Sequence, residues 1–239
     1  MERLKGYTTL PFHSTLRVLH LQVESAQFEL AKITFLLRCR PQSLWEPAKR
    51  QAIIRGLLET DHLSGPVIEM GVYTGGGTFL LATILESIAS KRTILAVDSF
   101  EGLPTPTNQD RVPSKNNEIH YVEGMFSEAS YEMLTYLLDA WGHHHRVQVY
   151  KGFFDNVLAS QHFSAGPFSM VVIDPDQYAE TKLCLEFFYP RMQPGGLIFV
   201  DDYKGTLAEG VNPAVDEFLI GKPETMEQGG LTMWFLRKL

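Results

Sequence analysis

Carboxylates follow two of the most apolar runs in this chain. Asp174 and Asp176 come after FSMVVI, and Asp201 and Asp202 come after GLIFV. If both runs are parallel strands, their carboxyl ends meet at one edge of a sheet, where ligands bind in such folds. Converging carboxylates repel one another, so we expect a divalent cation among them, and all-oxygen ligation favours Mg²⁺ or another hard ion. The alternative for Asp201 and Asp202 is that one of them only caps the following helix.

A glycine-rich stretch, VIEMGVYTGGGTF at residues 67–79, is the second feature that could do chemistry. Three residues separate Gly71 from the next glycine, so the G-x-G-x-x-G spacing of a dinucleotide site is absent. Gly77 stands before Thr78, where a phosphate loop has lysine. An NAD-dependent oxidoreductase is therefore disfavoured. What remains is a strand, an acid and a glycine turn leading into a helix, which lets a ligand lie against bare backbone.

Two acids indicate which ligand this turn suits. Glu69 would repel a pyrophosphate but attract an ammonium or sulfonium group, and Asp98 ends the next run, where a carboxylate accepts ribose hydroxyls. A ribose joined to a cationic tail indicates S-adenosylmethionine, although either acid alone fits a helix cap equally well. Phe153 is expected to stack on the adenine or to lie in the core, and Ser99 to bond the adenosine or to begin a turn. The predicted cofactor contacts are Glu69, Gly71, Tyr73, Thr74, Gly75, Asp98, Ser99, Gly152, Phe153 and Asp174.

Short β-branched runs alternate with amphipathic segments after the first quarter of the chain and predict the elements that position these side chains. PVIEMG, RTILAVD, RVQVYKG, FSMVVID and GLIFVDDY are typical of strands in a mostly parallel sheet. ETMEQGGLTMWFLRKL predicts two further strands in a hairpin that turns at Gly229–Gly230. Two helices are expected before the sheet, in residues 23–38 and 44–63.

These elements predict one α/β domain, residues 1–239, with a doubly wound, mostly parallel seven-stranded sheet. We place the core in residues 63–239 and an N-terminal helical cap in residues 1–62. The polar stretch 100–124 is long for a loop in a compact domain, which is typical of a functional segment. We expect the cap or this loop to act as a lid, with residues 1–20 ordered by substrate.

Composition limits the class of partner. The formal charge of −7 argues against general nucleic-acid binding, and no apolar run approaches the length of a membrane span. Cys39 and Cys184 are far apart and are expected to be buried free thiols. The start of the chain lacks the pattern of a secretory signal, so we expect a cytoplasmic location and a small-molecule partner.

Six segments of the sequence together resemble class I methyltransferases, specifically the macrocin O-methyltransferase type that modifies sugars of natural products. In chain order they are VIEMGVYTGGG, AVDSFEGLP, EGMFS, YKGFFDNVL, the stretch from VVIDPDQY to LIFVDDY, and NPAVDEF, within residues 67–218. The resemblance implies a Rossmann-like methyltransferase fold and S-adenosylmethionine as cofactor. It also implies that Asp174, Asp201 and Asp202 hold the metal and that Asp176 is the general base.

The sequence departs from the family pattern near the expected cofactor. The family usually has tryptophan and a basic residue where Tyr73 and Thr74 stand, glycine at Pro175 and tryptophan at Phe153. These departures concern individual cofactor contacts and leave the class unchanged.

The expected reaction is Mg²⁺-dependent O-methylation of a hydroxyl, one of two neighbouring hydroxyls, on a natural-product glycoside or related metabolite. A bound ion would acidify the hydroxyl and aim it at the sulfonium methyl, while Asp176 takes the proton. A catechol or phenylpropanoid acceptor stays open, as does a cofactor-binding protein without catalysis. The resemblance also implies a homo-oligomer.

Overall fold

The computed structural model describes residues 43–112, 118–160, 163 and 166–239. The chain divides into two units, residues 1–40 and 41–239, and the described residues all belong to the second. The helix predicted in residues 23–38 and the lid predicted in residues 1–20 lie outside the described residues. Within the described ranges, no helix is long and apolar enough to cross a membrane.

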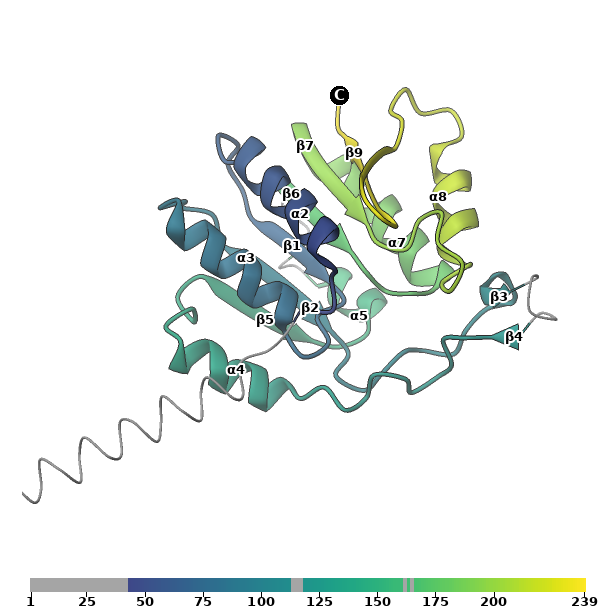
Figure 1. Cartoon of the computed structure of the whole chain (residues 1–239), viewed down its shortest axis with the longest axis horizontal. Helices are drawn as coiled ribbons and strands as arrows, with labels where there is room; N and C mark the ends of the chain where they lie inside the picture. The colour runs from purple at the N-terminus through teal and green to yellow at the C-terminus, as the bar shows by residue number, and fades with distance from the viewer. Residues whose placement is uncertain (1–42, 113–117, 161–162, 164–165) are drawn as a thin grey trace, which may run out of the picture. The chain divides into compact units, whose positions relative to one another are not determined.

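A seven-stranded sheet forms the centre of residues 41–239 (Figure 1). Its strands are β1 (Val67–Met70), β2 (Ile94–Asp98), β5 (Val147–Lys151), β6 (Phe168–Ile173), β7 (Met192–Val200), β8 (Glu227–Gly230) and β9 (Met233–Arg237). They lie in the order β5-β2-β1-β6-β7-β9-β8, and β9 runs antiparallel to β7 and β8 on either side of it, whereas the other neighbours are parallel. The predicted doubly wound, mostly parallel α/β fold is confirmed.

The ends of four neighbouring strands are level. Met70 pairs with Val97 on one side and Ile173 on the other, and Ile173 pairs with Val200. The strand order reverses between β1 and β6, which is the point where open α/β sheets bind ligands. The residues that reach this edge just after those pairs are Gly71, Asp98, Asp174 and Asp201.

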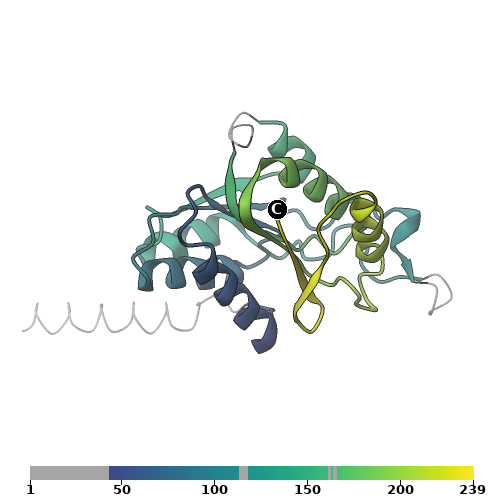
Figure 2. The same ribbon diagram turned by 90° about the horizontal axis from the view of Figure 1, so that it is seen from above.

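Helices cover both faces of the sheet. They are α2 (Pro47–Glu59), α3 (Gly76–Ser87), α4 (Tyr131–Ala140), α5 (Phe154–Leu158), α7 (Tyr178–Phe188) and α8 (Val211–Leu219), with the 3-10 turn η3 (Tyr189–Arg191) after α7. Helix α2 contacts α3 on one face, and α7 contacts α5 and α8 on the opposite face (Figure 2).

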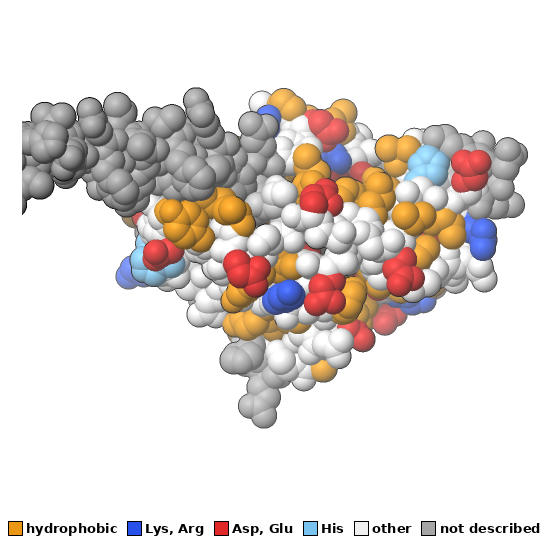
Figure 3. Space-filling model, turned by 90° about the horizontal axis from the view of Figure 1, so that it is seen from below, with side chains coloured by type: hydrophobic (Ala, Val, Ile, Leu, Met, Phe, Trp, Pro, Cys, Tyr) orange, Lys and Arg blue, Asp and Glu red, His pale blue; other side chains and the backbone are white. Residues whose placement is uncertain are grey.

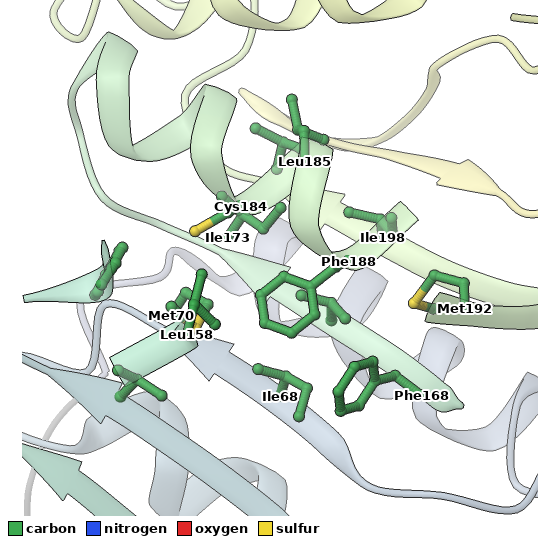
Figure 4. Packing of buried hydrophobic residues seen from close by; sticks show 14 of the residues in the cluster. Ile68, Met70, Leu158, Phe168, Ile173, Cys184, Leu185, Phe188, Met192 and Ile198 are labelled. Atoms are coloured by element: carbon green, nitrogen blue, oxygen red, sulfur yellow. The ribbon is translucent and has the colours of Figure 1, made fainter. Parts of the chain in front are cut away.

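The main hydrophobic core lies between the sheet and the layer of α5, α7 and α8. Alternate strand residues point into it, as expected for a sheet covered on both faces. Members of this core that are labelled in Figure 4 are Ile68, Met70, Leu158, Phe168, Ile173, Cys184, Leu185, Phe188, Met192 and Ile198. Cys184 is a buried free thiol, as predicted, and burial raises its pKa, whereas Cys39 lies outside the described residues.

Helix α2 lies close to the sheet because glycines leave room for it. A Cβ atom at Gly56 would stand 2.6 Å from the ring of Phe199 on β7, and one at Gly229 would stand 2.8 Å from Ala52 Cβ. Pro47 at its first turn suits the start of a helix, since proline lacks only an N–H that would have no partner there. Although the sequence grouped this helix with the cap, α2 packs on the sheet beside β8.

The predicted C-terminal hairpin is confirmed, but its turn was misplaced. Gly229 and Gly230 belong to β8, and the chain turns at Leu231 and Thr232. The glycines are in the strand because α2 approaches it: a Cβ at Gly230 would lie 2.7 Å from the carbonyl oxygen of Ala48.

The predicted loop at residues 100–124 is largely irregular. It contains the 3-10 turn η1 (Asn108–Asp110) and a small antiparallel pair, β3 (Arg111–Val112) and β4 (Glu118–Ile119), with residues 113–117 outside the described part. This loop leaves the sheet at the same edge as the aspartates.

Candidate active site

A cavity of about 620 Å³ opens at the carboxyl ends of β1, β2, β6 and β7. Eleven of the predicted site residues line it: Glu69, Gly71, Tyr73, Thr74, Asp98, Ser99, Phe153, Asp174, Asp176, Asp201 and Asp202. Two predicted residues do not line it. Gly75 precedes α3 and lies against Leu134, and Gly152, with φ 152°, lies against Val157. The structure thus brings the two sequence clusters to one cavity.

Asp98 organises the glycine turn. Its Oδ2 accepts hydrogen bonds from the backbone N–H groups of Val72 and Tyr73, both at 2.8 Å, and its Oδ1 accepts from the N–H of Phe100 at 2.8 Å. Three backbone donors leave this carboxylate, which can accept about four hydrogen bonds, with little capacity for a ligand hydroxyl. Asp98 therefore lines the cavity and also fixes the backbone that forms its wall.

Glu69 is buried beneath the same turn. Its Oε2 accepts a 2.5 Å hydrogen bond from the Thr78 hydroxyl, and a Cβ at Gly77 would stand 2.1 Å from its Oε1. Only glycine at position 77 lets the backbone of α3 approach this carboxylate. Burial raises the pKa of Glu69 to about 8, and Asp98 adds to this, although the bond from Thr78 lowers it. Nearby positive charge would favour its ionised form.

Two roles were open for each of Ser99 and Phe153, and the structure shows where both side chains lie. The Ser99 hydroxyl donates to the carbonyl of Gly102 at 2.8 Å and accepts from the N–H of Glu101, so it forms the turn after β2 while lining the cavity. Phe153 is 36% exposed at the cavity wall, so the interpretation as a core aromatic was wrong.

The aspartate cluster lies at the ends of β6 and β7, on the other side of β1 from Asp98 at the end of β2. Burial and the charges of Asp201 and Asp176 raise the pKa of Asp174 well above its usual value, and burial with Asp202 and Asp201 does the same to Asp176. Burial and Asp202 raise the pKa of Asp201 to about 6, against the lowering effect of Lys49. The shifts reflect the burial of these carboxylates and their mutual repulsion at the edge of the sheet.

Two residues of α2 and its N-terminal flank, which the sequence interpretation missed, contact this cluster. Lys49 Nζ lies 2.7 Å from Asp201 Oδ1 and 3.5 Å from Asp202 Oδ1, and the indole N–H of Trp45 donates to Asp174 Oδ2 at 2.8 Å. Burial would lower the pKa of Lys49, but Asp201 and Asp202 outweigh this and raise it. The available signal was the i, i+3 and i, i+4 spacing of Lys49 from Ala52 and Ile53, which puts a lysine on the buried side of the helix.

As the side chains stand, the aspartates do not fit a metal ion. In the described part of the chain, no group of three or more His, Cys, Asp or Glu side chains is placed to hold one. The donor set is all oxygen, as Mg²⁺ prefers, but Asp201 and Asp202 face the ammonium of Lys49 and Asp174 is bonded to Trp45. The predicted Mg²⁺ therefore lacks support from the geometry.

Backbone strain accompanies three of the predicted site residues. Tyr73, Asp176 and Asp202 have φ values of 51°, 62° and 60°, in the left-handed region that residues other than glycine seldom adopt. Such conformations persist only where the surroundings hold them, and they occur often at functional sites.

The loop 100–124 is fastened beside the cluster. Asp110 Oδ1 accepts the N–H of Tyr178, at the start of α7, and its Oδ2 accepts both the N–H and the hydroxyl of Thr107. Gln177 donates to the carbonyl groups of Pro104 and Tyr121, both at 3.2 Å. Both anchors hold the loop as a wall of the cavity.

The exposed charges on one face are mixed. Figure 3 shows acidic side chains among hydrophobic ones, with described Lys and Arg side chains scattered singly over that face. The exclusion of nucleic acid as a partner stays a prediction from composition.

Comparison with protein families decides the relationship. The model of the family described as Macrocin-O-methyltransferase (TylF) matches residues 49–224. The chain belongs to this family. The resemblance to macrocin O-methyltransferases expected from the sequence is confirmed, and the matched range includes every predicted site residue as well as Lys49.

Two O-methyltransferases are among the proteins with similar sequences. The chain is 27% identical over 150 residues to the 8-demethyl-8-(2,3-dimethoxy-alpha-L-rhamnosyl)-tetracenomycin-C 4'-O-methyltransferase of Streptomyces olivaceus, covering 60% of this chain and 54% of the relative. It is 29% identical over 146 residues to the Mycinamicin III 3''-O-methyltransferase of Micromonospora griseorubida, covering 60% and 57%. The match thus spans little more than half of either relative.

Two solved methyltransferase structures share the fold. The O-methyltransferase NovP matches with a TM-score of 0.63 and 22% identity over 80% of this chain and 77% of NovP. The calicheamicin methyltransferase CalS11 matches with a TM-score of 0.63 and 20% identity over 97% and 87%. At these identities the likeness establishes the fold of this macrocin-type chain.

Proposed function

We propose that this chain transfers a methyl group from S-adenosylmethionine to a hydroxyl of a natural-product glycoside or a related small metabolite. The observation that carries the proposal is that Glu69, Asp98 and the aspartate cluster line one and the same cavity. This pairs a site suited to a cationic nucleoside with carboxylates suited to a hydroxyl. The family and the names of the relatives support the same reaction.

The glycine turn is the proposed cofactor site. S-adenosylmethionine supplies a methyl group already activated by the positive charge on sulfur. Gly71 and Gly77 let backbone line the cavity without side chains, and Asp98 fixes the turn through Val72 and Tyr73. Glu69, protonated in the free protein near neutral pH, becomes the ionised partner of the cationic tail.

The acceptor is proposed to lie between the aspartates and the loop 100–124. The cavity is also lined by apolar and aromatic side chains: Leu44, Leu103, Pro104, Tyr121, Phe126 and Leu207. An apolar wall facing carboxylates fits a metabolite with a hydrophobic body and neighbouring hydroxyls. The name of one relative contains a rhamnosyl-tetracenomycin C, so a glycoside is the first class to test.

Asp176 is the proposed general base. Burial and the nearby charges of Asp202 and Asp201 raise its pKa well above that of an ordinary aspartate, which strengthens it as a proton acceptor. It lines the cavity with the other aspartates and can accept the hydroxyl proton as the methyl group transfers. Most of the rate would come from alignment of donor and acceptor.

If Mg²⁺ takes part, it must compete with side chains of this protein for the aspartates. The family resemblance assigns it to Asp174, Asp201 and Asp202, and Lys49 and Trp45 now contact these side chains. A cytoplasmic location and a homo-oligomer complete the proposal.

Titration calorimetry with S-adenosylmethionine, followed by transfer of its labelled methyl group to a panel of glycosides and catechols, tests the function. We expect binding by the parent and labelled product with glycosides. Asp176→Asn should keep the binding heat and lose about 10²- to 10⁴-fold in turnover. Labelling only of catechols would support the catechol reading, and binding without any turnover would support a non-catalytic protein.

A further inference from the structure

The packing of α2 on the sheet places Lys49 beside Asp201. Helix α2 is held against β7 because Gly56 admits the ring of Phe199, which brings the first turns of the helix over the end of that strand. Lys49 is 7% exposed, and the carboxylate of Asp201 beside it is also buried. A buried lysine requires a charged partner, and Lys49 finds it at 2.7 Å.

A second cation on the same oxygen would lie close to the first and be repelled by it. A Mg²⁺ ion binds carboxylate oxygen at about 2.0–2.1 Å, so an ion on Asp201 Oδ1 would fall close to an ammonium 2.7 Å from that atom. Two positive charges at such a separation in a partly buried site repel each other strongly. Lys49 also lies 3.5 Å from Asp202 Oδ1, so the conflict extends to both neighbouring aspartates.

We propose that Lys49 is the resident cation of the aspartate cluster and that it competes with a divalent ion for Asp201 and Asp202. The inference rests on the carboxylate cluster of the proposed function, but it concerns ion binding and does not depend on turnover. Lys49 holds Asp201 and Asp202 in place in the absence of metal. A metal ion binds there only when Lys49 withdraws.

Mn²⁺ binding, measured from the electron paramagnetic resonance signal of the free ion, tests this directly. We expect weak binding by the parent and at least tenfold tighter binding by Lys49→Met and by Lys49→Gln, which keeps a hydrogen-bond donor but no charge. Adding Asp201→Asn and Asp202→Asn to Lys49→Met should return the affinity to the parent level, because the ion then loses its ligands.

Lys182→Met is the matched control. Lys182 also makes a 2.7 Å ion pair, with Glu217 on the outer surface, so its loss changes the net charge equally without touching the cluster. We expect this variant to bind Mn²⁺ like the parent. A tenfold gain in Lys182→Met would show a general charge effect and would overturn the competition.

A second measurement needs only the parent protein. If Lys49 keeps the ion out, about 1 mM Mn²⁺ should leave the Tm of the parent unchanged. A clear rise in that Tm, or equal Mn²⁺ affinity in the parent and both Lys49 variants, would overturn the proposal. Failure of the proposed function would appear separately, as absence of heat with S-adenosylmethionine.

Discussion

The indole N–H of Trp45 donates to Asp174 Oδ2 at 2.8 Å, although 129 positions separate the two residues in the sequence. The bond connects the segment just before α2 to the end of β6. The six-membered ring of the indole also lies above α3, where a Cβ at Gly77 would stand 2.7 Å from it. Trp45 therefore lies against both the aspartate cluster and the glycine turn.

Trp45→Phe tests this bond. Phenylalanine keeps much of the ring packing but leaves the half-buried Asp174 without its donor, so we expect a loss of about 1–3 kcal/mol in the free energy of unfolding. Urea unfolding at pH 7 measures it. Trp141→Phe, at a residue 36% exposed, should change the stability by less than about 0.5 kcal/mol. Equal losses in both variants would contradict the role given to the bond.

Asp98→Asn should weaken the binding of S-adenosylmethionine by about 10- to 100-fold, a loss of about 1.4–2.8 kcal/mol. The amide offers one acceptor oxygen where the carboxylate serves Val72, Tyr73 and Phe100, so the glycine turn loses part of its support. Titration calorimetry gives the affinity. Asp139→Asn removes an exposed carboxylate near His144 and should bind the cofactor like the parent.

The stability of the free protein should fall as the pH rises from about 5 to 8. The folded protein holds a proton on Glu69 up to a pKa of about 8, whereas the unfolded chain releases it near 4.5. The folded state therefore binds more protons in this window, and the free energy of unfolding declines with pH. Asp201, with a pKa of about 6, contributes in the same direction.

Urea unfolding at about pH 5, 6, 7 and 8 checks this slope. Glu69→Gln mimics the protonated acid and should flatten the decline, most clearly above about pH 6. A parent protein that becomes more stable across this range, or a Glu69→Gln protein with an unchanged slope, would show that the pKa of Glu69 is not raised.

Asp110→Ala should loosen the loop 100–124 without altering the cofactor site. The variant loses the acceptor for Tyr178 and both bonds from Thr107, so we expect the KM for the acceptor to rise at least tenfold. The affinity for S-adenosylmethionine should stay within about twofold of the parent value. Asn108→Ala, in the same 3-10 turn but exposed, is the control. An unchanged KM in Asp110→Ala would exclude a role for the loop in acceptor binding.

The sequence predicted the sheet and its carboxylates well because both depend on local pattern. A buried run followed by an acid indicates a strand end, and parallel strands bring their ends together whatever their connections. Glu69, Asp98, Asp174 and Asp201 reached one cavity for that reason.

The partners of those acids were missed because they come from distant parts of the chain. Trp45 and Lys49 belong to a segment that looked like an ordinary amphipathic helix, and nothing local shows which strand end it will contact. The turn of the hairpin was misplaced at Gly229–Gly230 for a similar reason. Glycine is common in turns, but here it is needed because α2 passes close to β8.

The contact between α2 and β8 also has a consequence for biosynthesis. The guanidinium of Arg55 donates to the carbonyl of Gly229, and the two residues are 174 positions apart. At about 5–20 residues per second, the ribosome needs on the order of ten seconds or more to make that span. During this time α2 lacks β8, one of the two strands on which it packs. The support of the helix that carries Lys49 is thus completed only after one of the last strands of the fold has emerged.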